Sequence, residues 1–199
     1  MTHNGAMRQP IDLPVQPMLA KAVPDVPVGG DLVYEPKWDG FRCIVLRDGE
    51  EVELASRGTK PLTRYFPEVI EHVRRLVPSQ CVLDAEIVVR SGDPGAERLD
   101  WERLSQRIHP AESRIRRLAA ETPAELVCFD LLALEDTSLL GMPFRHRRNA
   151  LEQVLGHLGP ADPIHLTRVT DDPAVARDWF ERFEGAGLDG VVAKPLAAP

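Results

Sequence analysis

The stretch Glu35-Pro36-Lys37-Trp38-Asp39-Gly40-Phe41-Arg42 places a lysine inside an apolar, β-type segment and an Asp-Gly pair directly after it. Lysine side chains are almost never fully buried unless they are paired or have a task. A lysine ammonium is not a nucleophile, and lowering its pKa from about 10.4 to about 7 needs apolar walls or nearby cations. On a strand, Asp39 would share a face with Lys37 and accept a proton from its amine. The alternative is a strand-end lysine that reaches solvent before a turn, and this pattern alone does not decide between them.

Outward from this stretch, the spacing of apolar residues predicts a mixed α and β domain. Asp48-Gly49 is a turn signal between two β-type runs and predicts a hairpin. Gly185 and Gly187 are expected to end the last helix. Strands are expected in the runs 32–46, 51–56, 81–89, 125–134, 164–169 and 188–193, and helices over 64–77, 101–108, 113–120, 145–158 and 173–183.

The two-residue period of a strand makes further predictions about polar side chains. Asp84 and Glu86 should lie on the same face of their strand, whereas Phe129 and Asp130 should lie on opposite faces. Residues 1–30 contain prolines at positions 10, 14, 17, 24 and 27, which predicts an extended lead-in that wraps over the surface of the domain.

Several classes of protein are excluded by composition. No apolar run approaches the roughly 18 to 20 residues that a membrane span needs, and the first 30 residues lack the pattern of a secretory signal, so we expect a cytoplasmic protein without a membrane partner. The three cysteines and six histidines are scattered without the spacing of a disulfide framework or a zinc site. A structural metal is therefore not expected.

The charge balance bears on nucleic-acid binding. The chain has 31 Asp and Glu residues against 24 Lys and Arg residues, a net charge of −7. Neutralisation of phosphates by basic residues supplies much of the affinity for nucleic acid, so this balance is unfavourable for a protein that grips it alone. Two local clusters, Arg114-Ile115-Arg116-Arg117 and Arg145-His146-Arg147-Arg148, are the candidates for contacts with a DNA backbone.

The segment Lys37–Arg42 resembles the nucleophile motif of the covalent nucleotidyltransferases, the superfamily of ATP-dependent DNA ligases, RNA ligases and mRNA capping enzymes. Pro17-Met18-Leu19-Ala20 is similar to the lead-in of bacterial ATP-dependent DNA ligases. Later stretches resemble the other motifs of the superfamily, in its order: Ser56-Arg57-Gly58, Leu83-Asp84-Ala85-Glu86, Phe129-Asp130-Leu131-Leu132 and Leu188-Asp189-Gly190-Val191-Val192-Ala193-Lys194. Ordered matches over residues 17–194 identify the chain as a member of the ATP-dependent DNA ligase group.

This resemblance implies an α+β, ATP-grasp-like adenylation domain, with antiparallel sheets flanked by helices and the nucleotide in the groove between them. It implies that Lys37 attacks the α-phosphate of ATP to form lysyl-AMP, and that AMP then passes to the 5′-phosphate of nicked double-stranded DNA for strand joining in DNA repair. The implied cofactors are ATP and Mg²⁺ or Mn²⁺. A repair polymerase or an end-binding protein is an expected partner, and association with the bacterial nucleoid is the expected location.

The resemblance also assigns roles to individual residues. Phe129 stacks on adenine, which Glu35 reads largely through the backbone, although spacing alone would make Phe129 an ordinary core residue. Arg42 and Arg57 hold phosphate and ribose oxygens, and Lys194 binds the α-phosphate. Lys37 is the implied catalytic residue, the implied nucleotide-binding residues are Glu35, Lys37, Arg42, Arg57, Glu86, Phe129 and Lys194, and the implied metal ligands are Glu86 and Asp189.

Two departures from the pattern of the superfamily matter. Asp189 stands where much of the superfamily has Glu, so its role as a metal ligand is less secure. The sequence also ends at Pro199, before the last motif with its paired lysines and before the oligonucleotide-binding domain. We therefore expect residues 1–30 to be the lead-in and 31–199 an adenylation domain that is incomplete at its C-terminus, with the oligonucleotide-binding domain absent.

Alternative functions remain open at this point. NAD-dependent ligases share the nucleophile pattern but carry a nicotinamide-recognition domain before it, and the short proline-rich lead-in does not form one. An RNA ligase or a capping-type nucleotidyltransferase remains an alternative, because the nucleophile motif does not select the acceptor. A catalytically incomplete nucleotide-binding or partner-binding module is the alternative from another class.

Overall fold

The structure is a computed structural model that describes residues 7–93, 96–108, 111–183 and 188–199. The strands are β1 (Leu32–Trp38), β2 (Phe41–Asp48), β3 (Glu51–Ser56), β4 (Gln80–Ser91), β5 (Arg98–Leu99), β6 (Ala124–Leu134), β7 (Thr137–Ser138), β8 (Ile164–Leu166) and β9 (Leu188–Pro195). The helices are α1 (Pro67–Leu76), α2 (Trp101–Ser105), α3 (Glu112–Glu121), α4 (Phe144–Leu155) and α5 (Pro173–Phe183), with a 3₁₀ turn at Thr63–Tyr65.

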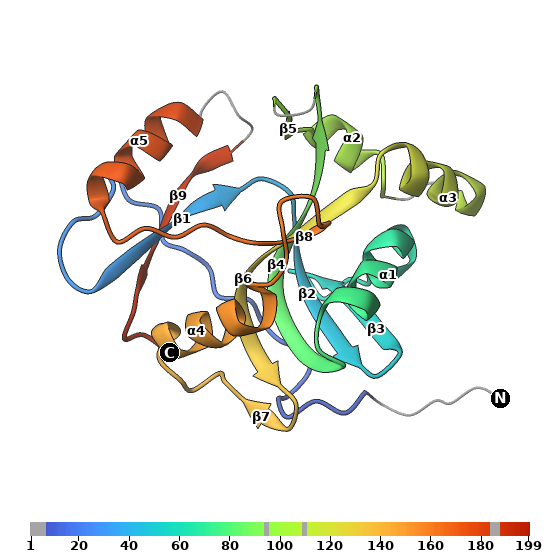
Figure 1. Ribbon diagram of the computed structural model, residues 1–199, viewed down its shortest axis with the longest axis horizontal. Coiled ribbons are helices and arrows are strands. Elements are labelled where there is room, and N and C mark those ends of the chain that lie inside the picture. Colours follow the sequence, from blue (N-terminus) through green and yellow to red (C-terminus); the bar gives the residue numbers. More distant parts are fainter. Residues whose placement is uncertain (1–6, 94–95, 109–110, 184–187) are drawn as a thin grey trace.

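These elements form two sheets with helices packed around them (Figure 1). The larger sheet has the order β3-β2-β4-β6-β7, with β5 beside β4 and β8 beside β6. All of its pairings are antiparallel except that of β6 with β8. The smaller sheet pairs β1 with β9 in antiparallel fashion, although some 150 residues separate them in sequence. Antiparallel sheets flanked by helices are therefore present as predicted.

Most of the helices and strands lie close to the residue ranges predicted from the sequence. The hairpin at Asp48-Gly49 is formed by β2 and β3, and α5 has the predicted bounds. Pro67 occupies the first turn of α1, where its missing N–H costs nothing, and the apolar side chains of that helix face the larger sheet. Gly185 and Gly187 lie outside the described residues. Among the described helices, none is long and apolar enough to cross a membrane.

The run 32–46 is not one strand, as the sequence analysis expected, but two strands in different sheets. The chain leaves the smaller sheet after Trp38 and enters the larger one at Phe41. Gly40 makes this crossing against β4, because a Cβ atom at that position would lie 2.2 Å from the carbonyl oxygen of Ile87. The Asp-Gly pair of the nucleophile stretch is therefore the point where the two sheets diverge.

The prediction that Phe129 and Asp130 face opposite sides of β6 is wrong. Asp84 of β4 pairs with Asp130 and Ala85 pairs with Cys128, so Phe129 is an extra residue in a β-bulge. Cys128 and Leu131 point into the main core, whereas Phe129 and Asp130 both line a cavity on the other side of the sheet. The bulge thus turns two consecutive side chains toward the same space.

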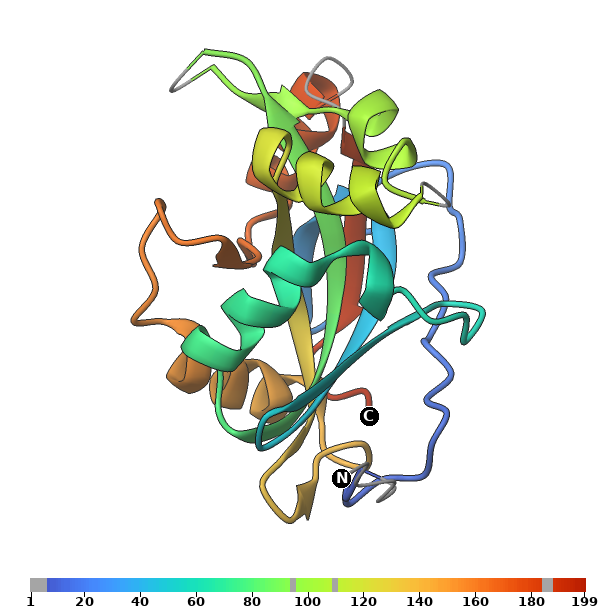
Figure 2. The same cartoon turned by 90° about the vertical axis from the view of Figure 1, so that its right-hand side faces the viewer.

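The lead-in packs over the opposite side of the larger sheet from the main core. Ile11 is buried against Ile44, Leu46, Val82 and Leu132, and Met7 and Val15 pack beside it. Figure 2 shows this segment in blue, running along the molecule from its N-terminal end toward β1. The described residues of the lead-in contain no helix or strand before Leu32, as the prolines predicted.

Candidate active site

A cavity of about 1320 Å³ lies between the two sheets. Its walls come from β1 and β9 on one side, from β2, β4 and β6 on the other, and from the end of β3 and the lead-in residues 15–20. All eight residues selected in the sequence analysis line it: Glu35, Lys37, Arg42, Arg57, Glu86, Phe129, Asp189 and Lys194. The fold therefore brings every one of these separated positions to a single space.

The amine of Lys37 forms an ion pair across the smaller sheet. Its Nζ atom lies 2.5 Å from Oδ2 of Asp189, and both side chains are about half exposed, at 47% and 50%. The two-residue period of a strand predicted Asp39 as the partner of this amine, but β1 ends at Trp38 and Asp39 lies in the crossing to β2. Asp39 still lies close enough to interact electrostatically with Lys37 and Asp189. Burial and the neighbouring carboxylate of Asp189 raise the pKa of Asp39, and the charge of Lys37 opposes them.

Glu35 is a buried carboxylate on the same strand. Its Oε2 atom lies 2.7 Å from Nζ of Lys194, on the facing strand β9. Within the described part of the chain its Oε1 atom has no hydrogen-bond partner, although only 2% of the residue is exposed. Burial raises the pKa of Glu35, while the charges of Lys194 and Arg148 lower it. A buried acceptor without a partner is destabilising, so the Oε1 atom of Glu35 is available to accept a hydrogen bond.

Phe129 lies among cations. The guanidinium carbon of Arg42 is 4.7 Å from the ring centroid, and Nζ of Lys194 is 5.1 Å from it. Arg42 also donates two hydrogen bonds of 2.6 Å to the carboxylate of Asp84. Lys194 lies over the ring of Phe144 as well, at 4.6 Å. These contacts fix both cations against an aromatic surface inside the cavity.

Asp84 and Glu86 lie on the same side of β4 and line the cavity together, which confirms the two-residue period. Both carboxyl groups are buried, and burial is the main reason why their pKa values are raised. The pKa of Glu86 rises to about 8, because the charge of Asp84 adds to the burial, whereas Arg42 and the backbone N–H of Gly40 oppose it. No pattern in the sequence indicated that Asp84 would be the carboxylate bound by Arg42.

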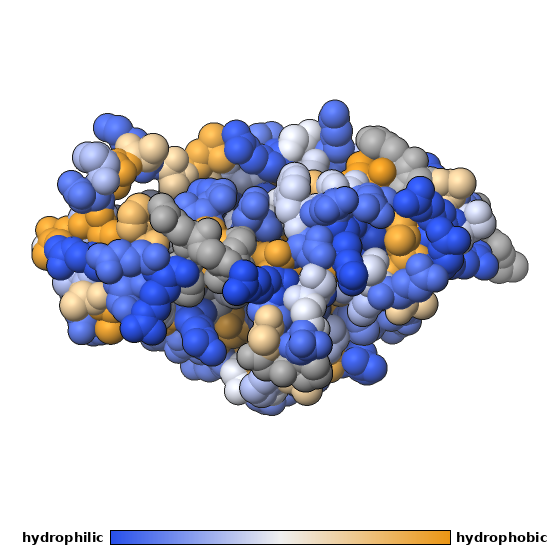
Figure 3. Space-filling view, turned by 90° about the horizontal axis from the view of Figure 1, so that it is seen from above, coloured by the Kyte–Doolittle hydropathy of each residue, from blue (hydrophilic) through white to orange (hydrophobic). Residues whose placement is uncertain are grey.

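The basic residues proposed for DNA contact differ in burial. Arg145 and His146 are exposed, and Arg145 forms an ion pair with Asp31. Arg147 and Arg148 are buried in ion pairs with Asp130 and Glu152, so the prediction that they contact a DNA backbone is wrong. The arginines of α3 are exposed, and α3 lies on a largely hydrophilic face (Figure 3). Two of them pair with glutamates of the same helix. Arg57 is exposed at the end of β3, and no ion pair is found for it within the described residues.

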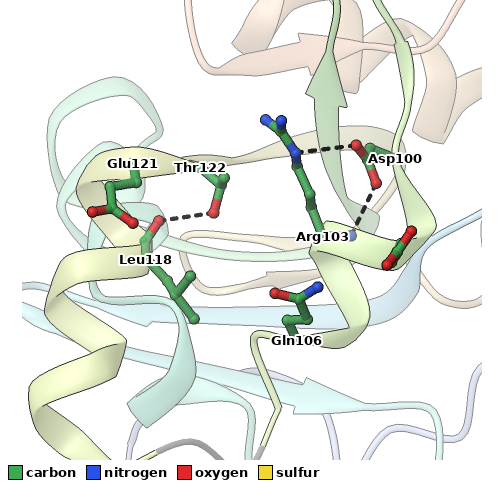
Figure 4. A pocket seen from close by; sticks show the side chains of 7 residues that line it. Asp100, Arg103, Gln106, Leu118, Glu121 and Thr122 are labelled. Atoms are coloured by element: carbon green, nitrogen blue, oxygen red, sulfur yellow. Dashed lines mark hydrogen bonds and ion pairs between the residues drawn. The ribbon is translucent and has the colours of Figure 1, made fainter.

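A second, smaller depression of about 630 Å³ lies between α2 and α3 (Figure 4). Arg103 pairs there with Asp100, and the hydroxyl of Thr122 donates to the carbonyl oxygen of Leu118. None of the residues selected from the sequence lines this depression. The chemistry suggested by the sequence therefore belongs to the cavity between the sheets.

Comparisons with known proteins agree with this geometry. The family model "ATP dependent DNA ligase domain" matches residues 17–199. The chain is 54% identical over 191 residues to DNA ligase C of Mycobacterium tuberculosis, covering 95% of this chain and 52% of that protein. It is 53% identical to DNA ligase C1 of Mycolicibacterium smegmatis, covering 97% of this chain and 55% of that protein. The chain thus spans about half the length of these curated relatives.

Solved structures show the same arrangement of elements. The ligase domain of LigD from M. tuberculosis superposes with a TM-score of 0.58 at 27% identity, covering 84% of this chain and 48% of that one. The DNA ligase-adenylate of Chlorella virus superposes with a TM-score of 0.55 at 16% identity, covering 91% of this chain and 60% of that one, which supports the fold alone. These likenesses confirm the fold class predicted from the sequence.

Proposed function

The chain belongs to the family of ATP-dependent DNA ligase domains, and from this premise we propose that residues 31–199 act as the adenylation domain of a DNA ligase. Lys37 takes AMP from ATP, and AMP is then passed to the 5′-phosphate of nicked DNA before the strands are joined. The observation that carries this proposal is the convergence of eight chemically suited residues, from separate stretches of the sequence, on one cavity that contains the Lys37 amine. Ligation by the whole protein is part of the proposal, as are its DNA and protein partners.

The fit of the cavity to an adenine base rests on Glu35 and Phe129. The exocyclic amino group of adenine is a hydrogen-bond donor, whereas guanine carries a carbonyl acceptor at the same position. The unpartnered Oε1 atom of Glu35 is a buried acceptor and therefore favours adenine. Phe129 offers a ring for stacking, with Arg42 over the ring as long as no base is bound. This arrangement supports ATP over GTP as the nucleotide.

The first chemical step is a substitution at the α-phosphorus of ATP. The lone pair of Lys37 Nζ forms a nitrogen–phosphorus bond, the bond from phosphorus to the bridging oxygen of the β-phosphate breaks, and pyrophosphate leaves. Two protons must leave the paired ammonium on the way to the phosphoramidate: one before attack, which frees the lone pair, and one after the nitrogen–phosphorus bond has formed. The Asp189 carboxylate, 2.5 Å away, is the acceptor of the first. Lys194 and the exposed Arg57 supply positive charge for the phosphate oxygens.

The carboxylates of Glu86 and Asp189 also fit a role for Mg²⁺ or Mn²⁺. Among the described residues, no group of three or more His, Cys, Asp or Glu side chains forms a metal cage. Mg²⁺ is commonly bound by one or two carboxylates together with substrate phosphates and water, so two such groups are sufficient once Glu86, whose pKa is about 8, has lost its proton. The ion, when bound, neutralises charge on the phosphate oxygens during transfer. Asp189, one methylene shorter than Glu, keeps the carboxylate that this role needs.

The proposal is tested by incubating the chain with α-labelled ATP and Mg²⁺ and resolving it by denaturing electrophoresis. We expect one label per chain, released by pyrophosphate, and no label on the Lys37→Ala variant. Lys21→Ala is the matched control, because Lys21 is an exposed lysine of the lead-in that does not line the cavity. Label that persists on Lys37→Ala would exclude Lys37 as the nucleophile. Binding of ATP without any label on the wild type would instead favour a nucleotide-binding module.

The second half of the proposal concerns DNA. The labelled, adenylated chain is mixed with nicked duplex or with nicked RNA, and transfer of label to the 5′-phosphate is followed. Transfer to nicked DNA supports the ligase, whereas transfer to RNA alone would favour the RNA ligase alternative. A repair polymerase or end-binding partner and a nucleoid location stay predictions from the resemblance.

A further inference from the structure

The proposed site is divided between two sheets, so its geometry depends on how the sheets are joined. Glu35, Lys37, Asp189 and Lys194 belong to the smaller sheet, and Arg42, Glu86 and Phe129 belong to the larger one. A nucleotide held against Phe129 is attacked by an amine that comes from the other sheet. The distance between Lys37 and Phe129 is therefore a property of the contacts that join the sheets.

The segment Thr167–Thr170, which follows β8, makes several of these contacts. The backbone of Thr170 exchanges two hydrogen bonds with Tyr34 of β1, of 2.8 and 3.0 Å. The indole Nε1 of Trp38, at the end of the same strand, donates a hydrogen bond of 2.9 Å to the hydroxyl oxygen of Thr167. Lys37 lies between Tyr34 and Trp38 in the sequence and directly beside Trp38. The nucleophile strand is thus held to the segment after β8 near both of its ends.

Thr167 is itself fixed to the larger sheet. It is buried, with 1% of its surface exposed. Its backbone N–H donates to the carbonyl oxygen of Cys128, the residue before Phe129, at 2.9 Å. Its carbonyl oxygen accepts a hydrogen bond of 3.0 Å from Arg148 of α4. Two hydrogen bonds through Thr167 therefore connect the neighbour of Lys37 with the neighbour of Phe129.

We propose that Trp38 and Thr167 are positioning residues, whose side-chain hydrogen bond holds the Lys37 amine at the reacting distance from a nucleotide bound against Phe129. The inference rests on the proposed function and adds a role for two residues that do not themselves react. Rates of transfer between bound groups are steeply sensitive to placement, and a shift of about 1 Å costs on the order of 100-fold. A hydrogen bond that only satisfied the indole N–H would contribute to stability and not to this rate.

The test uses variants that remove the hydrogen bond and keep as much of each side chain as the substitution allows. Trp38→Phe removes the indole donor and keeps an aromatic ring, Thr167→Val removes the hydroxyl and keeps the shape, and Thr167→Ser keeps the hydroxyl. Single-turnover labelling with α-labelled ATP gives the maximal adenylation rate and the ATP concentration at half-maximal rate. We expect the maximal rate to fall about tenfold or more in Trp38→Phe and Thr167→Val, with the half-maximal concentration within about twofold of wild type.

Two further comparisons separate positioning from stability. Thr167→Ser should keep the wild-type rate, and the double variant Trp38→Phe/Thr167→Val should be no slower than the slower single variant, because both remove the same interaction. Tyr34→Phe is the matched control. It deletes a hydrogen bond of 2.7 Å from the same strand to the carbonyl oxygen of Pro27, which does not join the sheets. Its melting temperature should fall as far as that of Thr167→Val, while its adenylation rate stays at the wild-type level.

The outcomes that overturn the inference are distinct from failure of the proposed function. Wild-type rates in Trp38→Phe and Thr167→Val, additive losses in the double variant, or an equal loss of rate in Tyr34→Phe would each reject the positioning role while adenylation itself stands. A wild-type chain that takes no label from ATP rejects the proposed function, and the positioning role falls with it.

Discussion

At the scale of single residues, Glu86 makes the stability of the chain depend on pH. Its pKa is about 8 in the folded chain, against an ordinary value of 4.5, mainly because the carboxyl group is buried. The folded state therefore holds a proton that the unfolded chain releases between these two values. Below pH 4.5 Glu86 is protonated in both the folded and the unfolded state. The free energy of folding that depends on this protonated form is fully present there, and it is lost as pH rises through about 8.

We therefore predict that Glu86→Gln, a neutral mimic of the protonated group, flattens the fall in unfolding free energy between about pH 5 and pH 8 by a few kcal/mol. The measurement is urea unfolding of the chain at several pH values, with chelator and without nucleotide. Glu97→Gln is the control, because Glu97 is exposed and lies outside the cavity. Parallel pH curves for wild type and Glu86→Gln would contradict a protonated Glu86 in the folded chain.

At Asp189, the effect of the side-chain charge and the effect of the side-chain length can be tested separately. Its carboxylate contacts the Lys37 amine and is half exposed, so the ion pair contributes little to stability. We predict that Asp189→Asn lowers the adenylation rate by about 100-fold or more, since the first proton acceptor is lost, with little change in melting temperature. Asp189→Glu restores the carboxylate and should recover most of the rate. Equal rates for the Asn and Glu variants would show that the charge at this position is not used.

At the scale of secondary structure, Gly40 is required for the separation of β1 from β2. A methyl group there would lie 2.2 Å from the carbonyl oxygen of Ile87, a backbone atom of β4, so the backbone would have to shift. We predict that Gly40→Ala lowers the free energy of unfolding by about 2 kcal/mol or more and reduces adenylation with it, since the position of Lys37 changes. Gly141→Ala is the matched control, with no atom within 4 Å of the added methyl. The measurement is urea unfolding of both variants. Equal free energies of unfolding for Gly40→Ala and Gly141→Ala would contradict the prediction.

The same elements show what the sequence could predict. The helices α1 and α5 follow from apolar spacing and proline placement, which are local properties. The bulge at Phe129 and the separation of β1 from β2 depend on contacts with β4, and the two-residue period of a strand contains no information about such contacts. The partner of Lys37 was missed for a related reason. Asp189 reaches it from a strand about 150 residues away, whereas period-two reasoning considered only its neighbour Asp39.

At the scale of the whole molecule, the eight candidate residues selected from the sequence lie around one cavity, whereas their contacts with one another were not predicted. The order of the motifs in the sequence was enough to select these eight residues, all of which line one cavity. The internal pairings, such as Arg42 with Asp84 and Glu35 with Lys194, arise only when the two sheets face each other. Four cations of the cavity, Lys37, Arg42, Arg147 and Lys194, are therefore already paired with carboxylates, and a bound nucleotide must exchange some of these partners for phosphate oxygens.

This exchange makes a prediction about the folded molecule as a unit. A nucleotide that contacts Glu35 on one sheet and Phe129 on the other binds only when both sheets are in place, so it should stabilise them together. At about 100 times its Kd, ATP should add about 2.7 kcal/mol, which raises the Tm of a chain of this size by about 5 to 10 °C. Hydrogen exchange should slow in β1 and β9 as well as in β4 and β6, because a bridging ligand opposes separation of the sheets.

The contribution of binding is separated from that of chemistry by Lys37→Ala, which should keep the ATP-dependent rise in Tm while losing the label. GTP should give a smaller rise, because its carbonyl meets the carboxylate of Glu35 where adenine offers a donor. If millimolar ATP leaves the Tm unchanged, the cavity is not a nucleotide site. If exchange slows in only one sheet, the ligand does not bridge them, and the assignment of either Glu35 or Phe129 to the base is wrong.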